Sequence, residues 1–368
     1  MKKLITLASV CAVATALVSC QSRPPKHAGL RCVPPANDTN PPITVHRSTG
    51  SLGLIERADP ALDDLISQDT PIEKLAEGFD WSEGPVWMPG GYLLFSDVPM
   101  NTIFKWDAKT GVSIYLQLTG YTGSAPRGGE PGSNGLTRDD EGRLIVCQHG
   151  DRRVARLENG RFVTVANRYE GKRFNSPNDA VVKSNGDIYF TDPPYGLVKN
   201  VDDPAKEIPF QGVYRVSAKD GTVTLLTSEV TRPNGLAFSP DESILYVASS
   251  DPQKAIWMAY PVNGDGTLGA GRVFFDATDL AKGRKGLPDG LKVDQLGNLW
   301  ATGPGGVLII SSQGKHLGTL ATGEATANCA WGEDGSTLYI TADMYLCRVR
   351  TKVKGAGFTA SEPVRGKK

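Results

Sequence analysis

Six segments of the sequence repeat one pattern, and this repeat constrains the fold more than any other feature. Each segment holds a short strand-like run, a polar turn that carries glycine or Pro-Asp, and a second run rich in aromatic and β-branched residues. No helical period separates the two runs. The segments are SEGPVWMPGGYLLFSD from Ser82, SNGLTRDDEGRLIVCQH from Ser133, PNDAVVKSNGDIYFTD from Pro177, PNGLAFSPDESILYVAS from Pro233, PDGLKVDQLGNLWATG from Pro288 and ANCAWGEDGSTLYITAD from Ala327.

The spacing of these segments matches the blades of a propeller. Their second residues follow one another at intervals of 39 to 56 residues, about the length of a four-stranded blade. One more strand-like run, IEKLAEGF from Ile72, has no blade of its own, and we expect it to pair with the last blade and close the ring. The sequence therefore predicts an all-β fold, a six-bladed β-propeller with four-stranded blades over residues 70–355, closed by an N-terminal strand.

The start of the chain predicts export. Residues 1–20 combine two lysines with a short apolar run, which is typical of a bacterial signal peptide and too short for a spanning helix. The run ends in a lipobox-like LVSC, which predicts lipidation of Cys20; ordinary signal-peptidase cleavage is the alternative. We expect a periplasmic protein whose only membrane contact is the lipid anchor. Residues 21–69, rich in proline, are predicted to be a flexible tether, and residues 356–368 a C-terminal tail.

The charge balance and the cysteine content bear on nucleic-acid binding and on disulfide formation. Lysine plus arginine and aspartate plus glutamate both number 40, so no basic field for nucleic acid is expected. Four cysteines follow the signal peptide, and an oxidising compartment permits a disulfide among them without indicating the pairing. They are Cys32, Cys147, Cys329 and Cys347. No feature of the sequence indicates an oligomeric state.

In a propeller the first strand of each blade lines the central channel, so residues in matching register form a ring. The second residues of the six segments are Glu83, Asn134, Asn178, Asn234, Asp289 and Asn328. Their carboxylate and amide oxygens are the ligands of a hard cation such as Ca²⁺, and the two carboxylates would repel each other without one. The alternative is that the Asn-Gly and Asp-Gly pairs only form turns around a channel that holds water.

The segments SEGPVW, FNSPNDAVV, TDPPYGL, RPNGLAFSPD and PDGLKVD together resemble the senescence marker protein and gluconolactonase family. Members of that family are six-bladed propellers that hydrolyse lactones with a divalent metal in the channel. The resemblance implies metal ligands at Glu83, Asn234 and Asp289, with Asn178 beside the metal as a ligand or a substrate contact. The animal members carry an arginine two residues before this asparagine, where the present sequence has Ser176, so we expect different substrate contacts.

Lactone hydrolysis needs an electrophile, a water molecule and a group that moves protons. The predicted cation, Ca²⁺ with Zn²⁺, Mn²⁺ and Mg²⁺ as alternatives, would polarise the ester carbonyl, and a carboxylate would assist the attack of water. The resemblance assigns this catalytic proton transfer to Asp289; a plain ligand role is the alternative. His149 is the rival base, although it can equally be a hydrogen-bonded turn residue.

Two loops are expected at the channel rim. Arg127 and Glu130 lie in the glycine-rich loop GYTGSAPRGGEPGSNG from Gly120 and are predicted to bind a hydroxylated substrate; solvated loop charge is the alternative. The insert YGLVKNVDDPAKEIPFQG from Tyr195 is a candidate lid. The complete set of predicted substrate contacts is Asn134, His149, Asn178, Arg127 and Glu130.

The sequence therefore predicts a metal-dependent hydrolase that opens a sugar lactone or a related cyclic ester. The alternative is a non-catalytic propeller that binds a small molecule or a protein around a structural metal, because propellers serve both roles. A propeller-type sugar dehydrogenase is disfavoured because few histidines lie near the channel.

Overall fold

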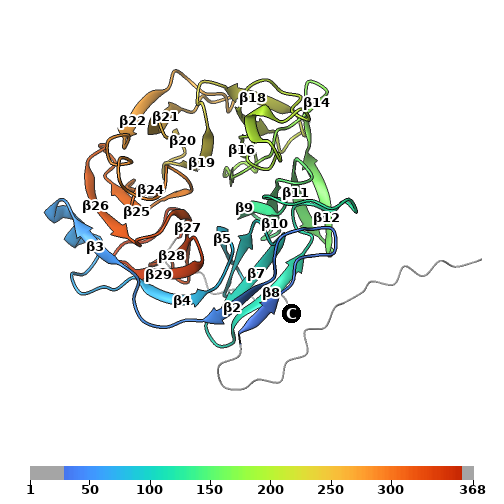
Figure 1. Cartoon of the computed structure of the whole chain (residues 1–368). Coiled ribbons are helices and arrows are strands. Elements are labelled where there is room, and N and C mark those ends of the chain that lie inside the picture. Colours follow the sequence, from blue (N-terminus) through green and yellow to red (C-terminus); the bar gives the residue numbers. More distant parts are fainter. Residues whose placement is uncertain (1–28, 359–368) are drawn as a thin grey trace, which may run out of the picture.

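The computed structural model of the protein describes residues 29–358. Six antiparallel sheets surround a central channel (Figure 1), which confirms the predicted six-bladed, all-β propeller. The described helices are two short 3-10 turns, η1 (Pro60–Asp64) and η2 (Asn200–Asp202), and neither is long enough to cross a membrane. The predicted signal peptide, the lipidation site at Cys20 and most of the predicted tail lie outside the described residues.

Blades 1 to 5 place their four strands in chain order from the axis outward, as antiparallel ladders favour. Blade 1 holds β5 (Ser82–Met88), β6 (Tyr92–Asp97), β7 (Thr102–Asp107) and β8 (Gly111–Gln117). Blade 2 holds β9 (Ser133–Arg138), β10 (Leu144–Gln148), β11 (Arg153–Glu158) and β12 (Arg161–Ala166). Blade 3 holds β15 (Ala180–Val182), β16 (Ile188–Asp192), β17 (Gly212–Val216) and β18 (Val223–Thr227). Blade 4 holds β19 (Pro233–Phe238), β20 (Ile244–Asp251), β21 (Lys254–Pro261) and β22 (Arg272–Asp276), and blade 5 holds β23 (Leu291–Val293), β24 (Leu299–Gly303), β25 (Gly306–Ile310) and β26 (His316–Ala321). A small ribbon of β13 (Arg168–Tyr169) and β14 (Lys172–Arg173) lies between blades 2 and 3 in the chain.

Blade 6 combines both ends of the propeller. The chain supplies β27 (Thr326–Gly332), β28 (Thr337–Ala342) and β29 (Tyr345–Arg350) last, and the outer strand is β4 (Glu73–Glu77), which precedes blade 1. The two pair antiparallel, with Tyr345 opposite Glu77 and Arg348 opposite Glu73. The outer edge of β29 is therefore hydrogen-bonded to an early part of the chain rather than exposed.

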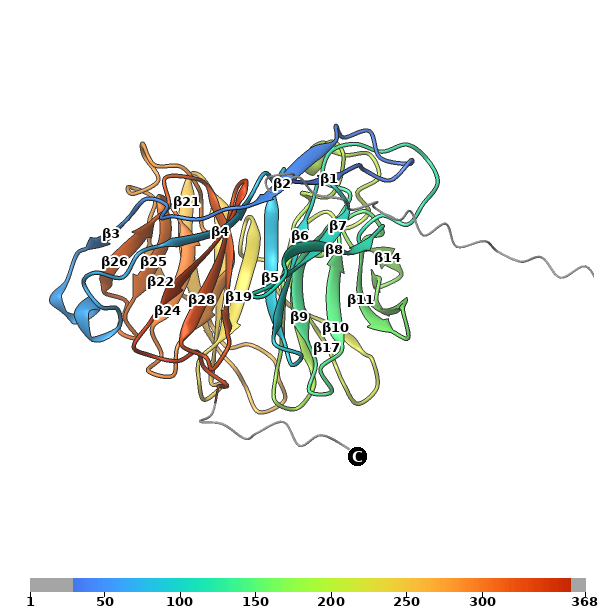
Figure 2. The same cartoon turned by 90° about the horizontal axis from the view of Figure 1, so that it is seen from below.

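The prediction of a flexible tether is wrong for its described part. β2 (Ile43–Arg47) pairs with β4, β1 (Leu30–Cys32) pairs with β2, and β3 (Leu54–Arg57) pairs with β26 of blade 5. Figure 2 shows β1 and β2 at the upper margin of the propeller, above β7 and β8. Proline-rich composition favours an extended chain, and an extended chain can add to an open sheet edge through its backbone alone.

The apolar core lies between neighbouring blades. The second strands β10, β16 and β24 are buried along their whole length because blades cover both of their faces. Aromatic pairs join adjacent blades: the rings of Trp300 and Trp331 lie 5.1 Å apart, and those of Trp87 and Tyr339 lie 5.4 Å apart. This packing fixes the inner strands that form the channel.

The permitted disulfide does not form among the cysteines of the blades. Cys147, Cys329 and Cys347 are buried thiols within the described part of the chain. Burial raises the pKa of each thiol, which keeps it protonated and unreactive.

Candidate active site

Five of the six predicted ring residues line one cavity of about 530 Å³. They are Glu83, Asn134, Asn178, Asn234 and Asp289. The sixth, Asn328, is also buried, and its Nδ2 donates to Glu83 Oε2 at 3.1 Å. The structure therefore brings the six positions together around the axis, as their common register predicts.

The glycine after most ring residues is required by the close approach of neighbouring blades. A Cβ at Gly84 would lie 2.1 Å from the carbonyl oxygen of Asn134, and one at Gly235 would lie 2.3 Å from that of Asp289. Glycine is the residue that lets two backbones approach this closely. The repeated Asn-Gly and Asp-Gly pairs therefore reflect inner-strand packing and not only turn formation.

Hydroxyl groups on the second strands hold the ring backbone in place. Ser96 donates to the carbonyl oxygen of Asn134 at 2.8 Å, and Thr191 donates to that of Asn234 at 2.7 Å. Thr302 bridges blades 5 and 6 in the same way, because it donates to the carbonyl oxygen of Ala327 at 2.8 Å. Each bond joins one blade to the first strand of the next and fixes the direction of the ring side chain there.

Buried aspartates support two of the strand entries. Asp97 accepts hydrogen bonds from the backbone nitrogens of Asp80 and Trp81, just before Glu83. Asp192 plays the same part in blade 3, where it accepts from the backbone nitrogens of Asn175 and Ser176 at 2.8 Å each. Burial raises the pKa of each aspartate to about 7, although these backbone hydrogen bonds oppose the shift.

The ring presents oxygens that no neighbouring group satisfies. Four buried side-chain oxygens around the cavity have no hydrogen-bond partner among residues 29–358, and they are Asn134 Oδ1, Asn178 Oδ1, Asn234 Oδ1 and Asp289 Oδ1. Buried polar atoms are almost always paired, so four exceptions facing one cavity indicate a missing partner. Oxygen donors from both carboxylates and amides suit a hard divalent cation.

The pKa values of the channel carboxylates also indicate a cation site. Burial, followed by the charge of Asp179, raises the pKa of Glu83 to about 8. Burial, and next the charge of Glu83, also raises the pKa of Asp289 well above its usual value. Two carboxylates that disfavour each other's ionised form would both be stabilised by one cation. No group of three or more His, Cys, Asp or Glu side chains with metal-holding geometry occurs in the described structure, so amide oxygens would have to complete any such site.

His149 lies behind the cavity wall. It is fully buried, its Nε2 lies 3.4 Å from Asn178 Nδ2, and its Nδ1 lies 3.7 Å from Glu130 Oε2. Burial, together with the charge of Arg127, lowers the pKa of His149 to about 3. An imidazole with so low a pKa is neutral and a weak base at neutral pH. This geometry favours the hydrogen-bonded interpretation of His149 over the rival-base interpretation.

The two charged residues of the glycine-rich loop, Glu130 and Arg127, have different surroundings. Glu130 lines the cavity, as predicted for a rim residue. Arg127 is not among the lining residues; its guanidinium donates to the carbonyl oxygens of Gly196 and of Gly150, the latter at 3.2 Å. The structure therefore turns Arg127 toward backbone groups of the rim and away from the substrate position that the sequence suggested.

Comparison with known proteins decides the family. Residues 81–343 match the SMP-30/Gluconolactonase/LRE-like region. The chain belongs to this family. A gluconolactonase from Zymomonas mobilis is 42% identical over 316 residues, covering 83% of this chain and 88% of that relative. The solved gluconolactonase of Xanthomonas campestris has a TM-score of 0.72 and 30% identity, covering 83% of this chain and 98% of that one. A calcium-binding regucalcin from Agrobacterium tumefaciens, with a TM-score of 0.59 and 18% identity over 77% of this chain and 93% of its own, shares the fold.

This member of the gluconolactonase family has a further channel carboxylate that the sequence analysis missed. Asp179 is buried next to Asn178, and its Oδ2 lies 3.4 Å from Asn328 Nδ2. Burial raises the pKa of Asp179, while the charge of Lys292 opposes the shift. The signal was present in the repeat: Asp179 occupies the position that glycine holds in four of the other segments.

Three large side chains of the cavity wall were also missed. Trp81, Tyr195 and Arg232 line the cavity. Tyr195 opens the insert that was predicted to be a lid, and Arg232 directly precedes the Pro-Asn-Gly of blade 4. Neither position is in register with the ring, so the repeat could not indicate them.

Proposed function

We propose that this protein is a lactone hydrolase that opens a gluconolactone-like sugar lactone with the help of a divalent cation, most consistently Ca²⁺. The observation that carries the proposal is the convergence of four buried oxygens without partners on one cavity that also holds Glu83. The gluconolactonases among its relatives support the substrate class.

Glu83, Asn178, Asn234 and Asp289 are the residues that would hold the cation. When bound there, a divalent cation supplies a Lewis acid for the lactone carbonyl and for the negative charge that develops on its oxygen. Asn134 also offers a buried oxygen without a partner among the described residues, and its position on the cavity wall suits a substrate hydroxyl.

We assign the proton transfer to Asp289. Its Oδ1 faces the cavity without a hydrogen-bond partner in the described chain, and burial raises its pKa above that of an exposed aspartate. As the water oxygen bonds to the carbonyl carbon, Asp289 takes one water proton. The ring C–O bond then breaks, and the departing ring oxygen receives the proton. Lactone and water thus give one hydroxy acid.

Arg232 is placed to hold the substrate or the acidic product. It lines the cavity, and its charge acts on the Tyr195 hydroxyl there and on the carboxylate of Asp251. Tyr195 and Trp81 supply the flat surfaces that sugar rings commonly contact. These three side chains lie outside the ring, whereas the four residues that would hold the cation belong to it.

Hydrolysis of glucono-δ-lactone and a panel of γ- and δ-lactones by chelator-treated protein tests the proposal. We expect no turnover until Ca²⁺, Zn²⁺, Mn²⁺ or Mg²⁺ is added, and loss of turnover in Asp289→Asn. Activity in the fully stripped protein would refute the metal dependence. Cation uptake that raises the melting temperature without turnover on any lactone would instead identify a non-catalytic binding propeller.

We also propose that the protein is exported and carries a lipid at Cys20. Support comes from the LVSC sequence that ends the apolar leader. Labelled palmitate should be incorporated into the wild type and not into Cys20→Ser, and the variant should leave the membrane fraction. Equal membrane association of both proteins would contradict the anchor.

A further inference from the structure

The segment before the propeller contacts the loop that carries Glu130. The backbone nitrogen of Arg127 donates to the carbonyl oxygen of Asn37 at 2.8 Å, and the nitrogen of Thr39 donates to that of Arg127 at 3.0 Å. The side chain of Asn37 donates to the carbonyl oxygen of Gly123. Asn37 and Thr39 thus hold the loop at two points, Gly123 and Arg127.

Side chains extend this attachment. Asn101 Nδ2 donates to Asp38 Oδ2 at 3.2 Å and to the carbonyl oxygen of Tyr121 at 2.9 Å. Asn40 Nδ2 donates to the carbonyl oxygen of Gly129, next to Glu130, at 3.4 Å. The loop is therefore held from the N-terminal side along most of its length.

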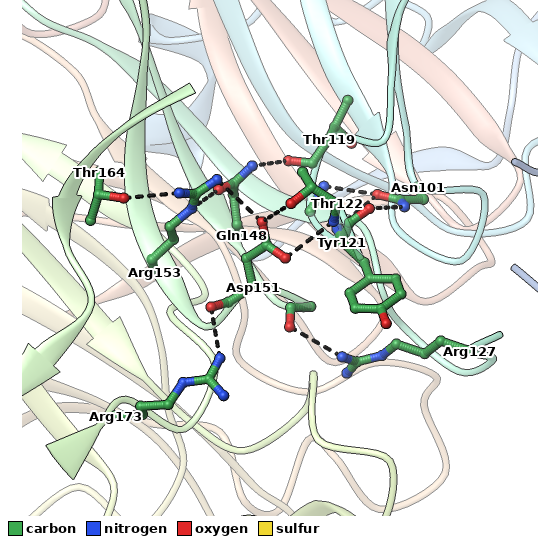
Figure 3. A network of polar contacts seen from close by, with 12 residues as sticks. Asn101, Thr119, Tyr121, Thr122, Arg127, Gln148, Asp151, Arg153, Thr164 and Arg173 are labelled. Atoms are coloured by element: carbon green, nitrogen blue, oxygen red, sulfur yellow. Dashed lines mark hydrogen bonds and ion pairs between the residues drawn. The ribbon is translucent and has the colours of Figure 1, made fainter. Parts of the chain in front are cut away.

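Figure 3 shows how the other side of the loop is held by the turn that follows β10. Gln148 Nε2 donates to the carbonyl oxygen of Thr119 at 2.7 Å, and Thr122 Oγ1 donates to Asp151 Oδ2 at 2.7 Å. Gln148 and Asp151 flank His149 and Gly150 in the chain. The loop consequently lies between the N-terminal segment and the residues behind the cavity wall.

Arg127 connects these parts to the cavity. Its guanidinium lies 5.3 Å from the ring centre of Tyr121 and donates to the carbonyl oxygens of Gly150 and Gly196. Gly196 directly follows Tyr195, which lines the cavity. The contacts of Arg127 thus reach the backbone beside Tyr195 on the cavity wall and beside His149 behind it.

We infer that Asn37, Asp38, Thr39 and Arg127, here called the N-terminal clamp, position Glu130 and Tyr195 on the wall of the substrate cavity. The inference rests on the proposed lactonase function. The first three residues lie outside residues 81–343, which match the family, so the clamp uses a segment additional to the matched propeller region. Charge-assisted bonds to carbonyl oxygens are strong and directional, which suits a positioning role.

Arg127→Met tests the clamp from the loop side, and Asn37→Ala/Asp38→Ala tests it from the segment side. Arg127→Lys is the conservative variant, and Val33→Ala, an exposed residue of the same segment, is the matched control. We expect KM for the best lactone to rise about tenfold in Arg127→Met, the factor that corresponds to loss of the charge-assisted hydrogen bond to Gly196, beside Tyr195. We expect kcat and Ca²⁺ affinity to change little, because the ring is untouched, and Arg127→Lys to restore part of the loss.

Combining the loop substitution with the two segment substitutions tests whether they act through one set of contacts. The triple variant should have the KM of Arg127→Met and no further increase, because both lesions break one clamp. Hydrogen exchange over residues 118–132 and 195–203 should accelerate in both variants and stay unchanged in Val33→Ala. Unchanged KM and unchanged exchange in folded variants would overturn the clamp. If the wild type hydrolyses no lactone, the proposed function fails, and hydrogen exchange still decides whether the clamp holds the rim.

Discussion

Replacement of Glu83 by glutamine tests whether the channel carboxylates are strained without a cation. Burial, followed by the charge of Asp179, raises the pKa of Glu83 from 4.5 to about 8 in the folded protein. Between these pH values the folded protein keeps a proton that the unfolded chain has released. Rising pH therefore lowers the free energy of unfolding of the metal-free protein over this interval, and the full loss is present above pH ~8.

The magnitude follows from the size of the shift. Each pKa unit corresponds to about 1.36 kcal/mol, so the shift of Glu83 costs on the order of 5 kcal/mol. This is a large part of a typical domain stability of about 5–15 kcal/mol. At about 2.1 cal/mol/K per residue, a propeller of this size would melt roughly 7 °C lower than it would without the strain.

The assay is thermal unfolding of chelator-treated wild type and Glu83→Gln from pH ~5 to pH ~9. We expect the wild type to lose about 7 °C more than the variant across this range, because glutamine is neutral and still accepts from Asn328. Saturating Ca²⁺ should restore the wild type and have a much smaller effect on the variant. Buried carboxylates that do not feel the charge of Glu83, such as Asp97 and Asp192, titrate in both proteins and cancel in the comparison. Asp289 does feel that charge, so its pKa falls in the variant, which adds to the difference in the expected direction.

Glu141→Gln provides the matched control, since its carboxylate is 69% exposed and pairs with Arg143 instead of a channel residue. It should follow the wild type at every pH. If metal-free Glu83→Gln loses stability as steeply as the wild type, the electrostatic reasoning about the channel is wrong.

Two further substitutions test how the ring is built. Gly235→Ala would place a Cβ 2.3 Å from a backbone oxygen of the next blade. We therefore expect the free energy of unfolding to fall by about 1–3 kcal/mol and calorimetry to show weaker Ca²⁺ binding. Gly264→Ala, whose Cβ would have no neighbouring atom within 4 Å, should change neither stability nor Ca²⁺ binding. Thr302→Val keeps the side-chain shape but leaves the carbonyl oxygens of Gly290 and Ala327 without their hydroxyl donor, which should cost about 1–3 kcal/mol in urea unfolding. An unchanged urea midpoint would contradict this role of the hydroxyl, and Thr302→Ser should keep most of the stability.

The strands of the N-terminal segment could not be predicted from its sequence. Its composition indicated an extended chain, and the chain is extended, but β1, β2 and β3 are bound to sheet edges. Strand addition uses backbone hydrogen bonds and leaves little periodic trace in the side chains. The available edge exists only after blades 5 and 6 have formed, so local sequence could not reveal it.

Asp179 and Arg127 differ in how far the sequence could reveal their positions in the structure. Asp179 could have been found, because aligning the six segments places it where four of the others carry glycine. Arg127 could not, because its partners Gly150 and Gly196 are backbone groups 23 and 69 residues away. A charged residue in a rim loop looks the same in sequence whether it faces the cavity or the protein.

The sequence by itself determined the number of blades, the register of the ring and the family. These follow from local requirements that recur in every blade: alternating apolar positions, a turn, and in most blades a glycine where inner strands touch. Only the tertiary structure decided which ring oxygens remain without partners, which carboxylates raise each other's pKa, and how the N-terminal segment holds the rim. Those properties depend on contacts between residues distant in the chain, and no local pattern encodes the distance between them.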